Sequence, residues 1–139
     1  MNYGRIVLAT VGGMVGYFAA GFAVFALAPQ MANEFQKYSS VYRSREGQMA
    51  AMPAGMAAML VAIFVLAVLY AMGHQGGSGI AEGARFGALI GVFVVCAFVV
   101  HNYMLLDIGV TLTVMQAVAY FLQWTVVGTV MGLLYKPSA

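Results

Sequence analysis

The chain has 139 residues, of which 63% are apolar or aromatic and 7% are charged, whereas a typical soluble domain carries about 25% charged residues. Its net charge of +2 and its scattered basic residues exclude a surface that follows nucleic-acid phosphates. Its single cysteine, Cys96, excludes an internal disulfide, a CxxC pair and a cysteine-based metal site. We therefore expect an all-α integral membrane protein that is not an enzyme and has no cofactor.

Four apolar runs cover residues 6–28, 49–72, 84–104 and 109–135. Each meets or nearly meets the roughly 20 residues of helix that cross a bilayer core about 30 Å thick. The first run is longer than the 7–15 residues of a signal-peptide core, so we interpret it as a membrane helix. Short connections make sequential helices antiparallel neighbours, so the sequence predicts a single domain with four transmembrane helices in an up-down-up-down bundle.

The first connection, residues 30–46, has an amphipathic pattern. Met31, Phe35, Tyr38 and Tyr42 recur at spacings of 4, 3 and 4, which places them on one face of a helix. This pattern predicts a short interfacial amphipathic helix between spans 1 and 2, and an ordinary polar loop is the alternative. The second connection, residues 73–79, is rich in glycine, and we expect it to be flexible with no built site.

Each predicted span contains small residues four positions apart. Between membrane helices the hydrophobic drive is weak, so close backbone approach through small residues is a main source of association. Packing within the bundle explains most of these residues, and the remaining grooves could hold a partner or a second copy. The pairs are Gly12/Gly16, Ala51/Gly55, Gly87/Gly91 and Gly128/Gly132.

The start of the second span carries a row of methionines. Met49, Met52, Met56 and Met59 share one helix face. Thioethers are soft ligands that suit Cu(I). However, methionine is also a flexible packing residue, and no histidine or cysteine lies within the same turn. We therefore interpret the row as packing and expect no metal.

The two ends of the third span carry most of its polar residues. Glu82 and Arg85, three positions apart, are a candidate ion pair at the start. At the other end a cluster of polar residues suits either a headgroup or proton-relay role, or simply a helix leaving the bilayer, which we favour. It comprises His101, Asn102, Tyr103 and Asp107, and Asp107 is also placed to cap the fourth span. A haem held by both histidines is excluded, because His74 and His101 are expected at opposite membrane faces.

The fourth span holds a polar stripe formed by Thr113, Gln116, Tyr120 and Gln123, at spacings of 3, 4 and 3. An unpaired amide in an apolar medium costs several kcal/mol, so the stripe must face the bundle, an interface or a hydrated path. Hydrogen bonds between helices explain it best. A lining for a ligand or a permeating solute is the alternative.

Three functions remain: a self-associating or accessory component of a membrane assembly, a small oligomeric transporter or channel, and a lipid- or quinone-binding protein. We expect the first, with membrane lipids and a homo-oligomer or larger membrane complex as partners. We expect a bacterial inner membrane. The positive-inside count gives three basic residues on each side, and the free α-amino group favours cytoplasmic termini. The side that holds the termini has Arg5, Arg85 and Lys136, and the opposite side has Lys37, Arg43 and Arg45.

Overall fold

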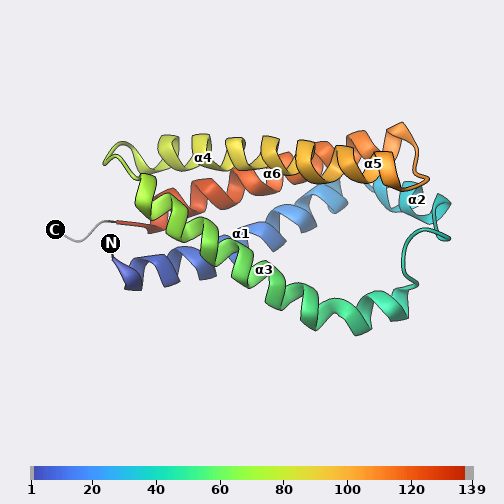
Figure 1. Ribbon diagram of the computed structural model, residues 1–139, viewed down its shortest axis with the longest axis horizontal. Helices are drawn as coiled ribbons and strands as arrows, with labels where there is room; N and C mark the ends of the chain where they lie inside the picture. Colours follow the sequence, from blue (N-terminus) through green and yellow to red (C-terminus); the bar gives the residue numbers. More distant parts are fainter. Residues whose placement is uncertain (1, 137–139) are drawn as a thin grey trace.

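A computed structural model describes residues 2–136, which form helices and no strands (Figure 1). Four helical segments are long and apolar enough to cross a membrane, which confirms the predicted class. The third of them is interrupted by the π-helical segment η1, so α4, η1 and α5 form one continuous rod. The elements are α1 (Tyr3–Leu27), α2 (Gln30–Lys37), α3 (Arg45–Gly73), α4 (Gly79–Val94), η1 (Val95–Val100), α5 (His101–Leu105) and α6 (Val110–Leu134).

The start of α3 lies four residues earlier than the predicted apolar run. Ser44 is its N-cap, and the Ser44 hydroxyl accepts a hydrogen bond from the Gly47 N–H at 3.2 Å. Glu46 in the first turn suits the positive end of the helix dipole. These polar residues extend the helix to 29 residues, beyond the stretch that hydrophobicity alone indicates.

Helix α2 is shorter than the segment predicted to form it. It ends at Lys37, so Met31 and Phe35 lie on the helix, whereas Tyr38 and Tyr42 follow it in turns. The prediction that all four share one helix face was therefore wrong. Lys37 donates a hydrogen bond to Glu34, and this bond raises the pKa of Lys37.

Helices α4 and α6 are in backbone contact along a row of glycines. A Cβ atom added at Gly83 would lie 2.9 Å from the Gly132 Cα and would overlap the Gly128 carbonyl oxygen. A Cβ at Gly128 would in turn overlap the backbone of Gly83 and Gly87. Only glycine permits this approach, so the predicted small residues Gly87, Gly91, Gly128 and Gly132 all lie at this contact.

Helix α1 packs on a second side of α6, with side chains in place of backbone contact. A Cβ added at Gly16 would lie 3.2 Å from a methyl group of Val130, and Gly12 faces Val130 and Leu134. The one fully buried hydroxyl nearby, that of Thr10, donates to the Ile6 carbonyl at 2.8 Å. Thr10 therefore brings no unpaired hydroxyl into this contact.

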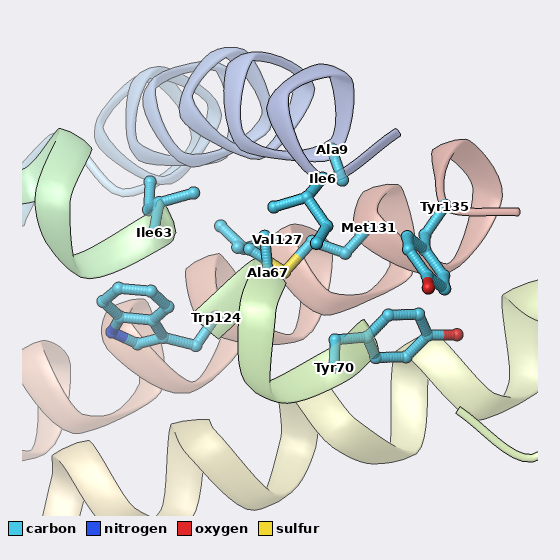
Figure 2. Packing of buried hydrophobic residues seen from close by; sticks show 9 residues of the cluster. All are labelled: Ile6, Ala9, Ile63, Ala67, Tyr70, Trp124, Val127, Met131 and Tyr135. Atoms are coloured by element: carbon cyan, nitrogen blue, oxygen red, sulfur yellow. The ribbon is translucent and has the colours of Figure 1, made fainter. Parts of the chain in front are cut away.

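The buried core lies where α3 crosses α1 and α6 (Figure 2). In that half of α3, Ile63, Ala67 and Tyr70 are at most 2% exposed. In the first half of α3, Met49 and Met52 are more than half exposed, and nothing lies within 4 Å of a Cβ built on Gly55. Figure 1 shows this first half diverging from the other helices. The core residues are Ile6, Ala9, Ile63, Ala67, Tyr70, Trp124, Val127, Met131 and Tyr135.

The first turn of α1 and the last turn of α6 lie at the same end of the molecule, together with the α3–α4 connection (Figure 1). Helix α2 and the α5–α6 connection lie at the opposite end. His74 and His101 are therefore at different ends, as the exclusion of a shared haem requires.

Candidate functional site

The polar stripe of α6 is tied to other parts of the chain by its two amides. The Gln116 Nε2 donates to the Tyr42 hydroxyl at 3.1 Å, and the Gln123 Nε2 donates to the Tyr17 backbone carbonyl at 3.4 Å. The Thr113 hydroxyl donates to its own helix, at the Gly109 carbonyl. Since both amides have partners in residues 2–136, the arrangement favours hydrogen bonding between elements over a polar lining.

Tyr120, the fourth member of the stripe, has a different environment. It lines a cleft of about 400 Å³ between α1, α3, the α4–η1 rod and α6, and its ring meets that of Phe98 edge to face at 6.5 Å. We call this site the aromatic cleft. Its lining residues are Tyr17, Met59, Phe93, Val94, Ala97, Phe98, Tyr120 and Trp124.

Trp124 lines the aromatic cleft and carries an unpaired donor. The residue is 6% exposed, and its ring centroid lies 5.3 Å from that of Tyr17. Its Nε1 is buried and has no hydrogen-bond partner in the described part of the chain. Leaving a buried donor unsatisfied costs about 1–3 kcal/mol.

The wall of the aromatic cleft opposite Trp124 includes part of the π-helical segment η1. Ala97 and Phe98 belong to both. A π-helix bonds each N–H five residues back, which widens the turn, and such segments are rare and frequently occur at functional sites. The apolar sequence Val-Cys-Ala-Phe-Val-Val gives no sign of the change in helix type, so sequence reasoning missed this part of the cleft.

The predicted polar cluster at the end of the third span is not assembled into a site. His101, Tyr103 and Asp107 are exposed, and within residues 2–136 no hydrogen bond or ion pair joins their side chains to one another or to Asn102. Asp107 also does not cap α6, because the N-cap is Gly109 and has no side-chain bond. The chain turns before α6 through extended backbone at Leu106, which takes Asp107 away from the helix start.

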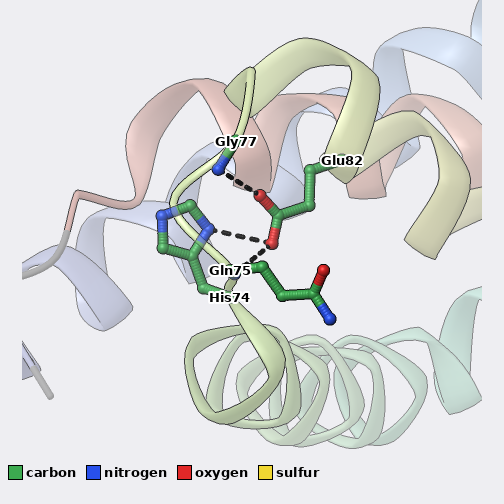
Figure 3. Close-up of polar contacts among 4 residues, drawn as sticks. All are labelled: His74, Gln75, Gly77 and Glu82. Carbon is green, nitrogen blue, oxygen red and sulfur yellow. Dashed lines mark hydrogen bonds and ion pairs between the residues drawn. The ribbon is translucent and has the colours of Figure 1, made fainter.

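The glycine-rich connection is more ordered than we expected, because Glu82 holds it (Figure 3). The Glu82 carboxylate accepts hydrogen bonds from the backbone N–H groups of Gln75 at 2.7 Å and Gly77 at 3.2 Å. His74 Nδ1 lies 3.1 Å from Glu82 Oε1. This distance suits an ion pair when the imidazole is protonated, although the direction is unsuitable for a hydrogen bond.

Arg85 is not the partner of Glu82. The ion pairs among the described residues are Lys37–Glu34 and His74–Glu82, so the predicted Glu82–Arg85 pair does not form. The reason is local. The connection folds back over the first turn of α4, and its backbone donors lie closer to the carboxylate than an arginine three residues along the helix.

Replacing Glu82 by alanine should loosen this connection. The loss of two charge-assisted bonds at a partly exposed site, worth about 1 kcal/mol, should speed amide exchange at Gln75 and Gly77 about five-fold. Hydrogen-exchange mass spectrometry of the detergent-solubilised protein measures this change. Arg85→Ala is the matched control and should leave exchange as in the wild type. Equal acceleration by both variants would mean that the Glu82–Arg85 pair forms instead.

A cavity of about 650 Å³ lies at the end of the molecule that holds α2. It combines the rings of Phe25 and Phe35 with the exposed residues Arg43, Arg45 and Gln48. Phe25 and Phe35 stack at 6.3 Å and form its apolar side. Apolar rings beside arginines are the composition of a membrane interface.

No family of known proteins, no curated protein and no solved structure matches the chain.

The methionine row lies on the uncovered part of α3. Met49, Met52 and Met56 are exposed, and only Met59 reaches the bundle, at the aromatic cleft. Within residues 2–136 no group of three or more His, Cys, Asp or Glu residues is placed to hold a metal. The expectation of no metal stays a prediction, because this finding says nothing of thioether ligands.

Proposed function

We propose that this chain is a non-catalytic component of a bacterial inner-membrane assembly and that it pairs with a second copy of itself through the first half of α3. The observation that carries this proposal is the uncovered bundle-facing side of that half. Met52, Met56 and Met59 continue the helix face of Ile63 and Tyr70. Ile63 and Tyr70 are fully buried, whereas Met52 and Met56 contact no other helix closely enough to be buried.

The two neighbouring faces of this half of α3 complement each other. The methionines form a row of long flexible side chains, and beside them Ala51, Gly55, Ala58 and Ala62 form a shallow groove. In a two-fold pair, the methionines of one copy insert into the groove of the other, and the reverse contact follows by symmetry. A self-complementary surface of this kind needs no second type of subunit.

The interior polar groups support this role over transport. A permeation path needs polar side chains that face a hydrated space, whereas Gln116 and Gln123 are engaged by Tyr42 and the α1 backbone. We further propose an up-down-up-down crossing with cytoplasmic termini, on the charge count given above. In this arrangement α2 lies in the headgroup region, which the interfacial composition of the 650 Å³ cavity supports.

Disulfide trapping in native membranes tests the pairing. In a Cys96→Ala background, Gly55→Cys should give a cross-linked dimer on mild oxidation, because Gly55 lies at the contact between the two copies. Ala57→Cys is the control at the same membrane depth and lies about 200° around the helix, so it should stay monomeric. Cross-linking of both positions alike, or of neither, would contradict the proposal.

Native mass spectrometry in mild detergent supplies the second readout. The proposal requires a species of twice the 14.7 kDa chain mass, and Gly55→Leu should shift it to the monomer. A wild-type monomer would refute self-association. A stoichiometric foreign subunit would also refute it and would make the chain an accessory component of another complex.

A further inference from the structure

The aromatic cleft lies deep in the membrane-spanning part of the bundle. Trp124 is fourteen residues from the start of α6 and ten from its end, which places it about 21 Å and 15 Å along the helix. Both distances fall well inside a hydrocarbon core of about 30 Å. Water and the ester groups of phospholipids are therefore absent at this depth, and neither can satisfy the Trp124 N–H.

The shape and chemistry of the cleft select a particular kind of ligand. Five aromatic rings and one thioether line it, and flat rings pack on such walls in offset or edge-to-face arrangements. Its volume of about 400 Å³ is within the range of pockets that hold small molecules. The five rings are those of Tyr17, Phe93, Phe98, Tyr120 and Trp124.

Hydrogen-bond donors are the polar groups that the cleft leaves unused. In the described part of the chain the hydroxyls of Tyr17 and Tyr120 form no hydrogen bond, whereas the Trp124 Nε1, which also has no partner, is buried and out of reach of a ligand. No acid, histidine or lysine lines the cleft. A complementary ligand therefore offers acceptor oxygens and no charge.

We propose that the aromatic cleft binds a flat, uncharged ring bearing carbonyl oxygens and an apolar tail, which is the chemistry of a membrane quinone. The hydroxyls of Tyr17 and Tyr120 donate to its carbonyl oxygens, the surrounding rings hold the ligand ring, and the tail leaves between α3 and the α4–η1 rod. The π-helical segment is the independent support, because it forms the wall at Ala97 and Phe98. The site binds the ring and performs no redox step.

Trp124 is the only tryptophan of the chain, so its fluorescence reports directly on the cleft. The probe is a short-chain ubiquinone with one isoprenoid unit, titrated into the protein in lipid nanodiscs. Binding predicts saturable quenching of Trp124, whereas collisions in the bilayer give quenching that rises linearly with probe. Linear quenching of the wild type would overturn the proposal.

Filling the cleft supplies the matched comparison. Ala97→Leu adds volume at the cleft wall and should weaken binding at least ten-fold, leaving only the linear quenching. Ala19→Leu adds the same atoms at an exposed position of α1 outside the cleft and should bind as the wild type does. Ala97→Val replaces Ala97→Leu if the larger side chain prevents folding. Saturable quenching unchanged by the cleft variant would also refute the site.

The role of the Tyr120 hydroxyl is tested by Tyr120→Phe, with equilibrium dialysis of labelled probe as the readout. Removing one hydrogen bond should weaken binding about five-fold. An analogue of the probe that lacks the carbonyl oxygens should bind the wild type and Tyr120→Phe equally weakly. Equal affinity of both proteins for the quinone itself would refute the assigned donor.

All cleft residues come from one chain and Gly55 is not among them, so ring binding does not require the proposed pairing through α3, although Met59 belongs to both surfaces. Gly55→Leu should therefore keep the saturable quenching even where it removes the dimer. If the wild type forms the dimer without saturable quenching, the cleft proposal has failed. If it shows saturable quenching without a dimer, the pairing proposal has failed.

Discussion

Gly128→Ala should be among the most destabilising single methyl additions to the protein. The new Cβ would overlap backbone atoms of Gly83 and Gly87, which cannot rotate away as a side chain can. The helices α4 and α6 must then separate along their whole contact. Overpacking of a tight core costs roughly 1–3 kcal/mol, and we expect the upper end of this range. Reversible unfolding in SDS, followed by Trp124 fluorescence, measures the change.

Gly73→Ala is the control for this experiment. A Cβ at Gly73 meets nothing within 4 Å, so the same substitution should leave the unfolding midpoint unchanged or raise it slightly. The slight increase would reflect the poorer helix propensity of glycine. Equal midpoints for Gly128→Ala and Gly73→Ala would mean that α4 and α6 do not touch through their backbones.

Ile63→Ala should have the second largest effect, with a loss of about 2 kcal/mol. Ile63 is fully buried at the point where α3 meets α1 and α6, and in the first half of α3 Met49 and Met52 remain more than half exposed. In a bilayer, an apolar side chain is solvated about equally well by lipid and by protein, so the hydrophobic effect adds little to the cost of the substitution. The expected loss is therefore the lost packing of a large-to-small change, at the low end of 2–5 kcal/mol.

Leu69→Ala removes the same number of carbon atoms from the same helix, at a side chain that is 48% exposed. It should change stability by less than about 0.5 kcal/mol. The same SDS titration compares the two variants. If Leu69→Ala were as destabilising as Ile63→Ala, α3 would have to be packed on both faces, contrary to the arrangement described.

The sequence was sufficient to predict the four membrane-spanning helices, because length and hydrophobicity decide this question. It could not predict how α3 is placed. Met52 and Ile63 are equally apolar, and lipid and protein neighbours suit an apolar side chain equally well. The small-residue pairs have the same limit, since Gly87 is in backbone contact and Gly55 is open although both have a small residue four positions away.

The candidate sites were harder to predict than the spans. The stripe on α6 was recognised from its spacing, but the partners of Gln116 and Gln123 lie 74 and 106 residues away in the chain. The sequence indicated that the Glu82 carboxylate needs a partner. However, it accepts hydrogen bonds from the backbone N–H groups of Gln75 and Gly77, and the residue types there do not predict this. The aromatic cleft combines residues from four helical segments, so no local pattern contains it.

Helix α6 packs against α1, α3 and α4 and follows all three in the chain. Until it enters the bilayer, the glycines of α4 have no backbone surface to meet, and α1 lacks most of its neighbours. The packing of these helices therefore depends on a segment that is synthesised after them. We expect a chain that is truncated before α6 to be unable to assemble the bundle.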